Sequence, residues 1–216
     1  LFGLESRDSI RNFDFIGFTL QYEMSYTGVL NMLELAGVPL LAKDRDDSCP
    51  IVVAGGPCAC NPEPLADFVD VFSLGEGEEA TVELTELYRK HKSKGFCKAD
   101  FLREAAQIEG HYVPSLRDVG YSEEVGVQAC TARVGASVMA RTRIMLDMDK
   151  SFYPDKFVVP FTEIVHDRAV SEIFRGCIRG CRFCQAGYVY RPVRNRSKDL
   201  CAAYAMEALS DSGYEE

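Results

Sequence analysis

The sequence predicts an α/β protein whose first half forms a parallel sheet covered by helices. Three short apolar runs, at residues 13–20, 50–56 and 69–74, are typical of buried parallel strands. Segments with helical spacing of apolar residues follow the first and the third run. Glycines end the second and third runs, where the backbone of an open α/β sheet turns or approaches a ligand. The pattern indicates a partial Rossmann-like sheet.

Local signals mark the helices of this half. Ser25 is a potential N-cap and Gly37 a potential C-cap for the helix that follows the first strand. The charged stretch 42–50 is expected to form a loop. The remaining helices are expected at 64–68, 79–94 and 100–109.

The middle of the chain is less regular. Strand-like pieces lie at 125–134 and 138–146, and the proline-containing run 153–160 is expected to be an extended linker. The predicted organisation therefore has three parts: a sheet domain at 1–114, an irregular linking region at 115–168 and a second domain that begins at 169.

Three closely spaced cysteines follow a β-prone segment at 169–174. Cys177, Cys181 and Cys184 form a C-x3-C-x2-C run, close enough to bind three corners of a [4Fe–4S] cube. Four thiolates normally saturate the four irons, so a set of three leaves one iron open to a small molecule unless a distant cysteine closes it. A helix is expected after this run at 200–209, with Ser197 as its N-cap.

Zinc binding and disulfide formation are the alternatives for these cysteines. A structural zinc site pairs C-x2–4-C with a second Cys/His pair. His166 and Cys201 are the nearest candidates, and neither lies at such a spacing. A disulfide framework is less favoured, because ligands this close in sequence rarely pair with one another.

The cysteine run, with Phe183 just before its third cysteine, resembles the signature of the radical SAM superfamily. The resemblance implies that the open iron binds S-adenosylmethionine (SAM), that Phe183 contacts this cofactor, and that reduction of SAM yields a 5′-deoxyadenosyl radical. It implies an external electron donor of the flavodoxin or ferredoxin type. It also implies that 169–216 begins a (β/α) barrel with its first βα unit.

The longer string at 175–197 resembles a radical SAM subgroup whose barrel follows a cobalamin (B12)-binding-like domain. Residues 52–80 are similar to the later half of that domain. The candidate cofactor contacts implied there are the residues at the ends of the second and third strands: Gly55, Gly56, Gly75, Glu76 and Gly77.

Cobalamin binding stays open at this point. The G-x-G-x-x-G fingerprint and the D-x-H-x-x-G stretch that ligates cobalt in some corrinoid proteins are both absent from the sequence. His91 and His111 are expected in polar helical or loop settings. Each glycine pair is also compatible with a structural turn. If a corrinoid binds, methyl transfer to an unactivated carbon becomes part of the expected chemistry.

Composition excludes several other classes. The net charge of −9 argues against a broadly basic nucleic-acid surface. Nine cysteines, an odd number, fit a reducing cytoplasm better than a secreted disulfide scaffold. The sequence contains no apolar run near the roughly 20 residues that span a bilayer, so we expect a soluble, cytoplasmic protein with no membrane partner. The chain does not begin with Met, and one strand and one helix cannot close a barrel. We therefore expect a fragment that is inactive alone.

Two further functions compete with a radical SAM enzyme of unassigned substrate. An iron–sulfur electron-transfer or metal-structured binding module would need a fourth ligand, for which Cys201 is the nearest candidate. A methylthiotransferase-like RNA-modifying enzyme would need a second three-cysteine cluster. Cys49, Cys58 and Cys60 are near one another in sequence, but their C-x8-C-x-C spacing does not match that family.

Overall fold

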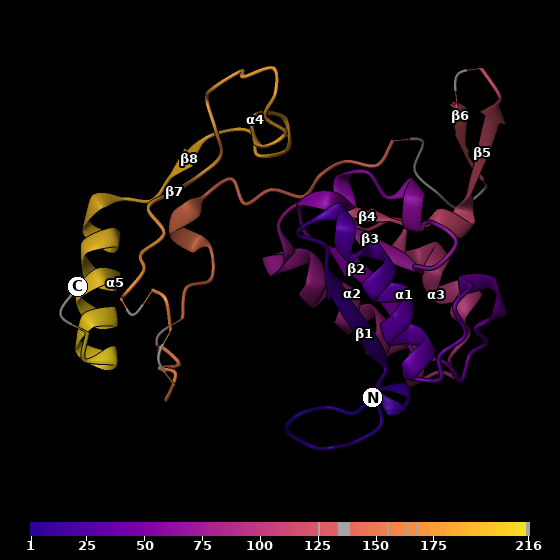
Figure 1. Ribbon diagram of the computed structural model, residues 1–216, viewed down its shortest axis with the longest axis horizontal. Coiled ribbons are helices and arrows are strands. Elements are labelled where there is room, and N and C mark those ends of the chain that lie inside the picture. Colours follow the sequence, from indigo (N-terminus) through magenta and orange to yellow (C-terminus); the bar gives the residue numbers. More distant parts are fainter. Residues whose placement is uncertain (125, 134–138, 155, 163, 167, 215–216) are drawn as a thin grey trace. The chain divides into compact units, whose positions relative to one another are not determined.

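The computed structural model describes residues 1–216 except 125, 134–138, 155, 163, 167, 215 and 216. The chain divides into two compact units, Leu1–Ile144 and Met145–Glu216 (Figure 1). The strands of the first unit are β1 (Phe15–Thr19), β2 (Ile51–Gly55), β3 (Val71–Ser73), β4 (His111–Tyr112), β5 (Arg117–Ser122) and β6 (Gly126–Ala132). Its α-helices are α1 (Tyr26–Leu35), α2 (Gly77–Lys92) and α3 (Lys98–Ala105). The second unit contains β7 (Phe174–Arg175), α4 (Ala186–Val189), β8 (Arg194–Asn195) and α5 (Lys198–Ser212).

A four-stranded sheet in the order β1-β2-β3-β4 organises the first unit. The three predicted strands run parallel, with Phe15 opposite Ile51 and Val53 opposite Val71. This confirms the predicted α/β class with a mostly parallel sheet. The fourth strand, β4, pairs antiparallel with β3 and was not predicted. Its two residues are too few to show a periodic pattern.

Helices cover both faces of this sheet because alternate side chains of each strand point to opposite sides. Val52 and Ala54 of β2 pack in one core with Leu33 of α1. Ile51 packs in a second core with Phe101 of α3. The central strand is therefore buried on both faces, as its unbroken apolar run predicts.

The helix ends follow the sequence signals in part. Gly37 takes a positive φ of +67° directly after α1 and its C-cap residue. The Ser25 side chain donates a hydrogen bond to the Tyr22 carbonyl rather than capping α1. The helix expected at 64–68 is instead a short 3-10 helix over Glu63–Leu65. None of the helices in the described part of the chain combines the length and apolar character needed to cross a membrane.

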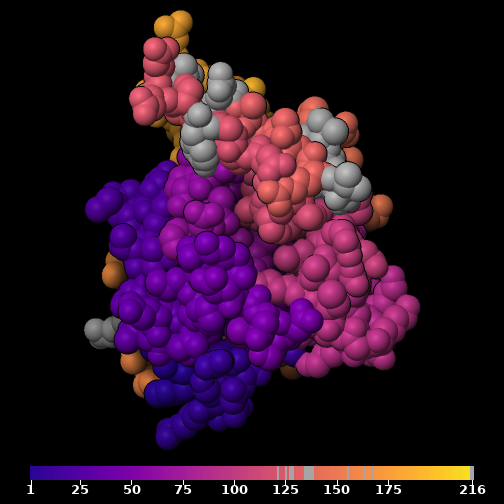
Figure 2. All heavy atoms as spheres, turned by 90° about the vertical axis from the view of Figure 1, so that its right-hand side faces the viewer, coloured from indigo at the N-terminus to yellow at the C-terminus, as the bar shows by residue number. Residues whose placement is uncertain are grey.

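A buried ionic network joins β3 to α3 and to the loop before β2. Asp70 accepts hydrogen bonds from the Val52 N–H at 2.8 Å and from Arg45 Nε at 3.2 Å. Lys98 Nζ lies 2.8 Å from the other carboxylate oxygen and 3.1 Å from the Ala42 carbonyl. The face turned to the viewer in Figure 2 shows the α3 region in magenta beside that loop in purple. These charges compensate one another where water is excluded.

The irregular region begins with an antiparallel hairpin of β5 and β6. The strand expected at 125–134 is confirmed as β6, although residues 125 and 134 lie outside the described part. Its partner β5 was missed because it lacks alternating hydrophobicity. The strand expected at 138–146 is wrong for its described residues, 139–146. They contribute one isolated bridge, between Arg143 and Gly75.

The second unit is held together around α5. This helix follows Ser197, as predicted, and ends at Gly213 with a φ of +73°. The Tyr153 ring stacks on Tyr204 of α5 with centroids 4.2 Å apart. The segment expected to be a linker therefore begins inside the packing of this unit. Where a strand was expected at 169–174, only Phe174 and its neighbour Arg175 form one, paired antiparallel with β8.

Candidate functional site

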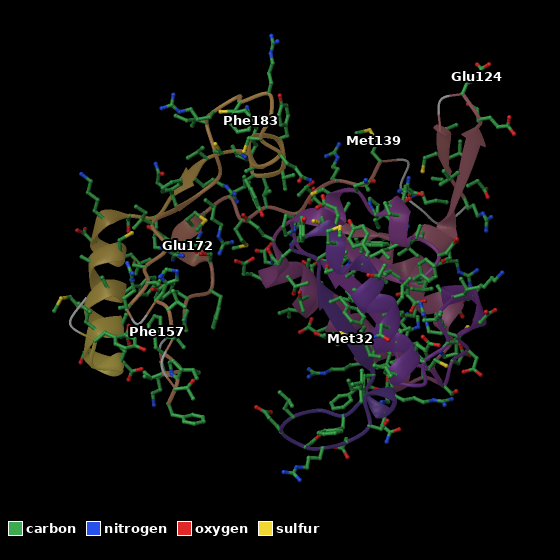
Figure 3. The ribbon with its side chains drawn as sticks, viewed as in Figure 1. Met32, Glu124, Met139, Phe157, Glu172 and Phe183 are labelled. Atoms are coloured by element: carbon green, nitrogen blue, oxygen red, sulfur yellow. The ribbon has the colours of Figure 1, made fainter. Side chains whose placement is uncertain are left out.

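The three clustered cysteines lie in one loop, residues 176–193, which we name the cysteine loop. The pairing of β7 with β8 closes this loop at its base, with Phe174 opposite Asn195 and Arg175 opposite Arg194. The short helix α4 lies within it. Figure 3 labels Phe183 on the loop and Glu172 near its base. The structure thus brings all three predicted metal ligands onto a single closed segment.

The cysteine thiols are available for ligation. Cys177, Cys181 and Cys184 are half-buried, and each is a free thiol. The Cys177 N–H donates to the Tyr190 carbonyl at 3.0 Å, which ties the N-terminal side of the loop to its C-terminal side. The Cys184 N–H donates to the Cys181 carbonyl at 3.1 Å in a tight turn. The disulfide alternative finds no support at these positions.

Two glycines let the arms of the loop approach closely. Gly176 has a φ of +104°, and a Cβ placed there would lie 2.6 Å from the Pro192 carbonyl oxygen. A Cβ at Gly187 would lie 2.7 Å from the Arg179 carbonyl oxygen. Both contacts are too short for a side chain. By contrast, Gly180 has open space around it, so the loop is tight at its base and at α4 and roomy between Cys177 and Cys181.

Buried arginines anchor the C-terminal side of the loop. Arg194 donates to the Met145 carbonyl at 2.8 Å. Arg196 donates to Ser151 Oγ at 2.8 Å, and its guanidinium lies 5.2 Å from the centre of the Tyr204 ring. The arginine-rich string at 191–197 suggested no role by itself, because its partners are distant in sequence. In the structure it fastens the cysteine loop to α5 and to the start of the unit.

The loop region carries strong positive charge. Between residues 173 and 197 the sequence has six arginines and no acidic residue. Arg175 is paired with Glu172 at 2.6 Å, and this hydrogen bond, with a further one from Arg196, lowers the pKa of the Glu172 carboxyl. Arg179 and Arg182, which are close in sequence to the cysteines, have exposed side chains. They keep positive charge beside the cysteines.

Three thiols on one loop are the donor type that iron–sulfur clusters take. Within the described ranges, no three His, Cys, Asp or Glu side chains gather to hold one ion. Mononuclear zinc needs four ligands around one point. A cubane cluster instead takes one thiolate at each of several irons, so its ligands need not converge. Of the candidate fourth ligands, Cys201 lies in the first turn of α5 and His166 is exposed.

Phe183, the predicted SAM contact, is 92% exposed, and nearby Ile178 is 78% exposed. Both are close in sequence to the exposed Arg179 and Arg182. An exposed aromatic ring beside candidate cluster ligands offers an apolar face for a flat heterocycle.

Two of the glycines at the carboxyl edge of the sheet, Gly56 and Gly75, lie close to the backbone of other segments of the chain. Gly56 has a φ of +93°, and a Cβ there would lie 2.8 Å from the Leu20 carbonyl oxygen. Gly75 has a φ of +97° and lies directly against the Arg143 backbone. The Arg143 carbonyl also accepts a hydrogen bond from the Glu76 N–H at 2.9 Å. These backbone contacts give Gly56 and Gly75 a structural reason to be glycine.

The other two residues predicted at this edge are part of the backbone framework. Gly55 is the last residue of β2, and its carbonyl accepts a hydrogen bond from the Leu20 N–H at 2.7 Å. Gly77 is the first residue of α2. A Cβ at Gly55 would meet the Ser73 carbonyl at an ordinary 3.6 Å, and one at Gly77 only the Thr81 side chain, so close backbone approach accounts for Gly56 and Gly75 alone.

Cys49, Cys58 and Cys60, the candidates for a second cluster, do not gather at one point in the described part of the chain. Cys49 precedes β2, whereas Cys58 and Cys60 follow it on a 3-10 helix. A five-residue strand spans roughly 17 Å, so these thiols lie at opposite ends of the sheet. This separation argues against the methylthiotransferase alternative.

His111 is placed differently from the prediction. It was expected in a polar setting, but on β4 it is only 5% exposed. Burial, with a smaller contribution from the positive charge of Arg143, lowers the pKa of the His111 imidazole to about 4. The Ala105 backbone opposes this shift in pKa, although its contact with the ring lies outside strict hydrogen-bond geometry within the described structure.

Comparisons with known proteins connect this site to a family. The family model described as "Radical SAM proteins, N-terminal" matches residues 1–114. An uncharacterized protein of Methanocaldococcus jannaschii is 31% identical over 207 residues, which cover 95% of this chain and 37% of that protein. The chain thus spans little more than a third of the length of this relative. The cysteine loop lies beyond the residues of the family match. The match covers more than half of the sequence, and the chain therefore belongs to the radical SAM proteins.

Proposed function

We propose that this chain contains the cluster-binding site of a radical SAM enzyme. Cys177, Cys181 and Cys184 bind three irons of a [4Fe–4S] cluster and leave the fourth iron for SAM. The observation that carries the proposal is the cysteine loop itself: three free, half-buried thiols on one closed segment with no acidic residue. Family membership supports a cluster and SAM as the cofactors.

When bound, the cluster supplies the electron that splits SAM into methionine and a 5′-deoxyadenosyl radical. The residues of this chain would hold the cluster and shape its surroundings. The β7–β8 pair and the glycine contacts fix the loop that presents the thiolates. The exposed Phe183 ring, next in sequence to Cys184, supplies an apolar contact for SAM in this proposal.

An acidic electron donor of the flavodoxin or ferredoxin type is the partner that this surface favours. Arg179 and Arg182 are exposed and close in sequence to the three ligands. Positive charge at such a place raises the rate at which a negatively charged protein associates. The rest of the chain is acidic overall, so the attraction is confined to this region.

We do not extend the proposal to cobalamin. The support for a corrinoid was the glycine-rich carboxyl edge of the sheet, and Gly56 and Gly75 are in contact with Leu20 and Arg143 there.

Single cysteine substitutions test the ligand set. Cys177→Ala, Cys181→Ala and Cys184→Ala are each expected to lose most of the iron and sulfide that the wild-type protein takes up on anaerobic reconstitution, because each removes one of three thiolates. Iron and sulfide analysis with visible absorption measures this loss.

Cys201→Ala is the matched control, since Cys201 is also half-buried in the same unit. It is expected to retain the cluster. Loss of the cluster in Cys201→Ala would instead indicate a closed site with four thiolates, typical of an electron-transfer module. Full retention in all three loop variants would refute the ligand assignment.

A further inference from the structure

The cysteine loop has two arms that must keep a set distance. The first arm carries Cys177 and Cys181. The second begins at Cys184 and continues through α4. At the base, the Cys177 N–H bonds to the Tyr190 carbonyl at 3.0 Å. Nearer the middle, the close contact of Gly187 with the Arg179 carbonyl is a packing contact without a hydrogen bond of its own.

Arg191 links the arms at that middle point. Its Nε donates to the Gly187 carbonyl on α4, and its Nη2 donates to the Arg179 carbonyl at 3.1 Å. Arg179 lies between the first two cysteines, whereas Gly187 follows the third. One guanidinium thus bonds to both segments that carry the thiols.

An arginine suits this position for a geometric reason. The guanidinium is planar and carries its N–H donors in a fixed fork, so it can bond two carbonyl oxygens at a defined separation. A lysine ammonium has the same charge but presents its donors from one atom on a flexible chain. Neither carbonyl is an anion, so charge alone does not explain the contact.

We propose that Arg191 is a positioning residue for the three cysteines: its fork fixes the separation of the two loop arms and hence the spacing of the thiols. This inference rests on the proposed function of the same site. Arg191 need not touch the cluster or SAM. It acts through the two carbonyls, before and after metal binding.

The test compares Arg191→Ala, Arg191→Lys and the control Arg182→Ala. Arg182 is an exposed arginine of the same loop, so its removal costs equal charge without the two hydrogen bonds. In the metal-free protein, amide hydrogen exchange over residues 176–190 is measured by mass spectrometry. Hydrogen bonds from a charged donor justify an expected acceleration of about tenfold or more in Arg191→Ala. Arg182→Ala should match the wild type.

The reconstituted protein gives a second readout. The rate at which a chelator removes iron is expected to rise about tenfold or more in Arg191→Ala and to stay near the wild-type rate in Arg182→Ala. Arg191→Lys should behave like Arg191→Ala, because it keeps the charge and loses the fork. If Arg191→Lys behaved like the wild type, positive charge alone would be sufficient, and the proposed role of the guanidinium fork would be wrong.

A further variant disturbs the same contact without changing Arg191, so the inference can still be tested if the arginine variants misfold. Gly187→Ala keeps Arg191 and pushes α4 away from the Arg179 carbonyl. It should loosen the same stretch in hydrogen exchange. Equal exchange and iron-release rates in Arg191→Ala and Arg182→Ala would overturn the inference. If the wild type took up no cluster, the proposed function would fail, and the exchange comparison would still decide whether Arg191 holds the loop.

Discussion

At the residue scale, several side chains make structural contacts that their neighbours in the sequence did not predict. Arg194 and Arg196 are buried and bonded to partners nearly 50 residues away. His111 was expected in a polar helical or loop setting but is buried on β4. In each case the deciding neighbour comes from another element, so no local pattern reveals it.

The buried His111 makes stability depend on pH. Its imidazole is neutral in the folded chain, with a pKa of about 4, while the unfolded chain takes up the proton near pH 6.5. As pH falls below 6.5, proton uptake therefore favours unfolding. The free energy of unfolding of the first unit should drop by about 2 kcal/mol between pH 7 and pH 5 from this group.

Urea unfolding followed by circular dichroism at the two pH values measures the effect. His111→Gln should lose this part of the pH dependence, whereas His166→Gln, at an exposed position, should keep it. An unchanged slope in His111→Gln would show that this histidine does not titrate as its burial implies.

At the element scale, contacts between distant segments decide the architecture of both units. The strand ends carry glycines because Leu20 and Arg143 cross them, and β4 joins the sheet through two residues only. The network around Asp70 ties α3 to β3. In the second unit the β7–β8 pair sets the base of the cysteine loop.

Removal of Asp70 should strongly destabilise the first unit. Asp70→Ala leaves Arg45 and Lys98 buried without their common counter-ion and the Val52 N–H without an acceptor. Loss of one partner of a buried ionic group costs about 3–5 kcal/mol. Chemical unfolding should show that loss, while Asp67→Ala, at an exposed position in the same loop, should change the unfolding free energy by less than about 0.5 kcal/mol. Similar small changes in both variants would show that the network contributes little.

At the scale of the whole molecule, much of the first unit followed from the sequence. Three strands, the helices between and after them and the limits of α5 rest on local patterns of apolar residues, caps and glycines. β5 was missed because it lacks alternation, and the strand expected at 169–174 is confined to its end because most of that segment does not pair. The sequence of one segment does not predict which distant segment it will pair with as a β-strand.

The sequence predicted which residues make up the candidate site, but not the contacts that hold its loop in place. The spacing of the three cysteines indicated a cluster, and the structure places them on one loop. The fastening of that loop by Arg191, Arg194 and Arg196 depends on backbone carbonyls and rings that are remote in sequence. Such side-chain-to-backbone contacts leave no periodic signal.

The most direct test of the central claim is electron paramagnetic resonance of the complete protein, reconstituted anaerobically and then reduced, with and without SAM. The account predicts the signal of a reduced [4Fe–4S] cluster that changes when SAM is added, because SAM binds the open iron. The signal should be absent when Cys177, Cys181 and Cys184 are all replaced by Ala. A cluster whose signal ignores SAM, or a protein that takes up zinc in place of iron, would contradict the account.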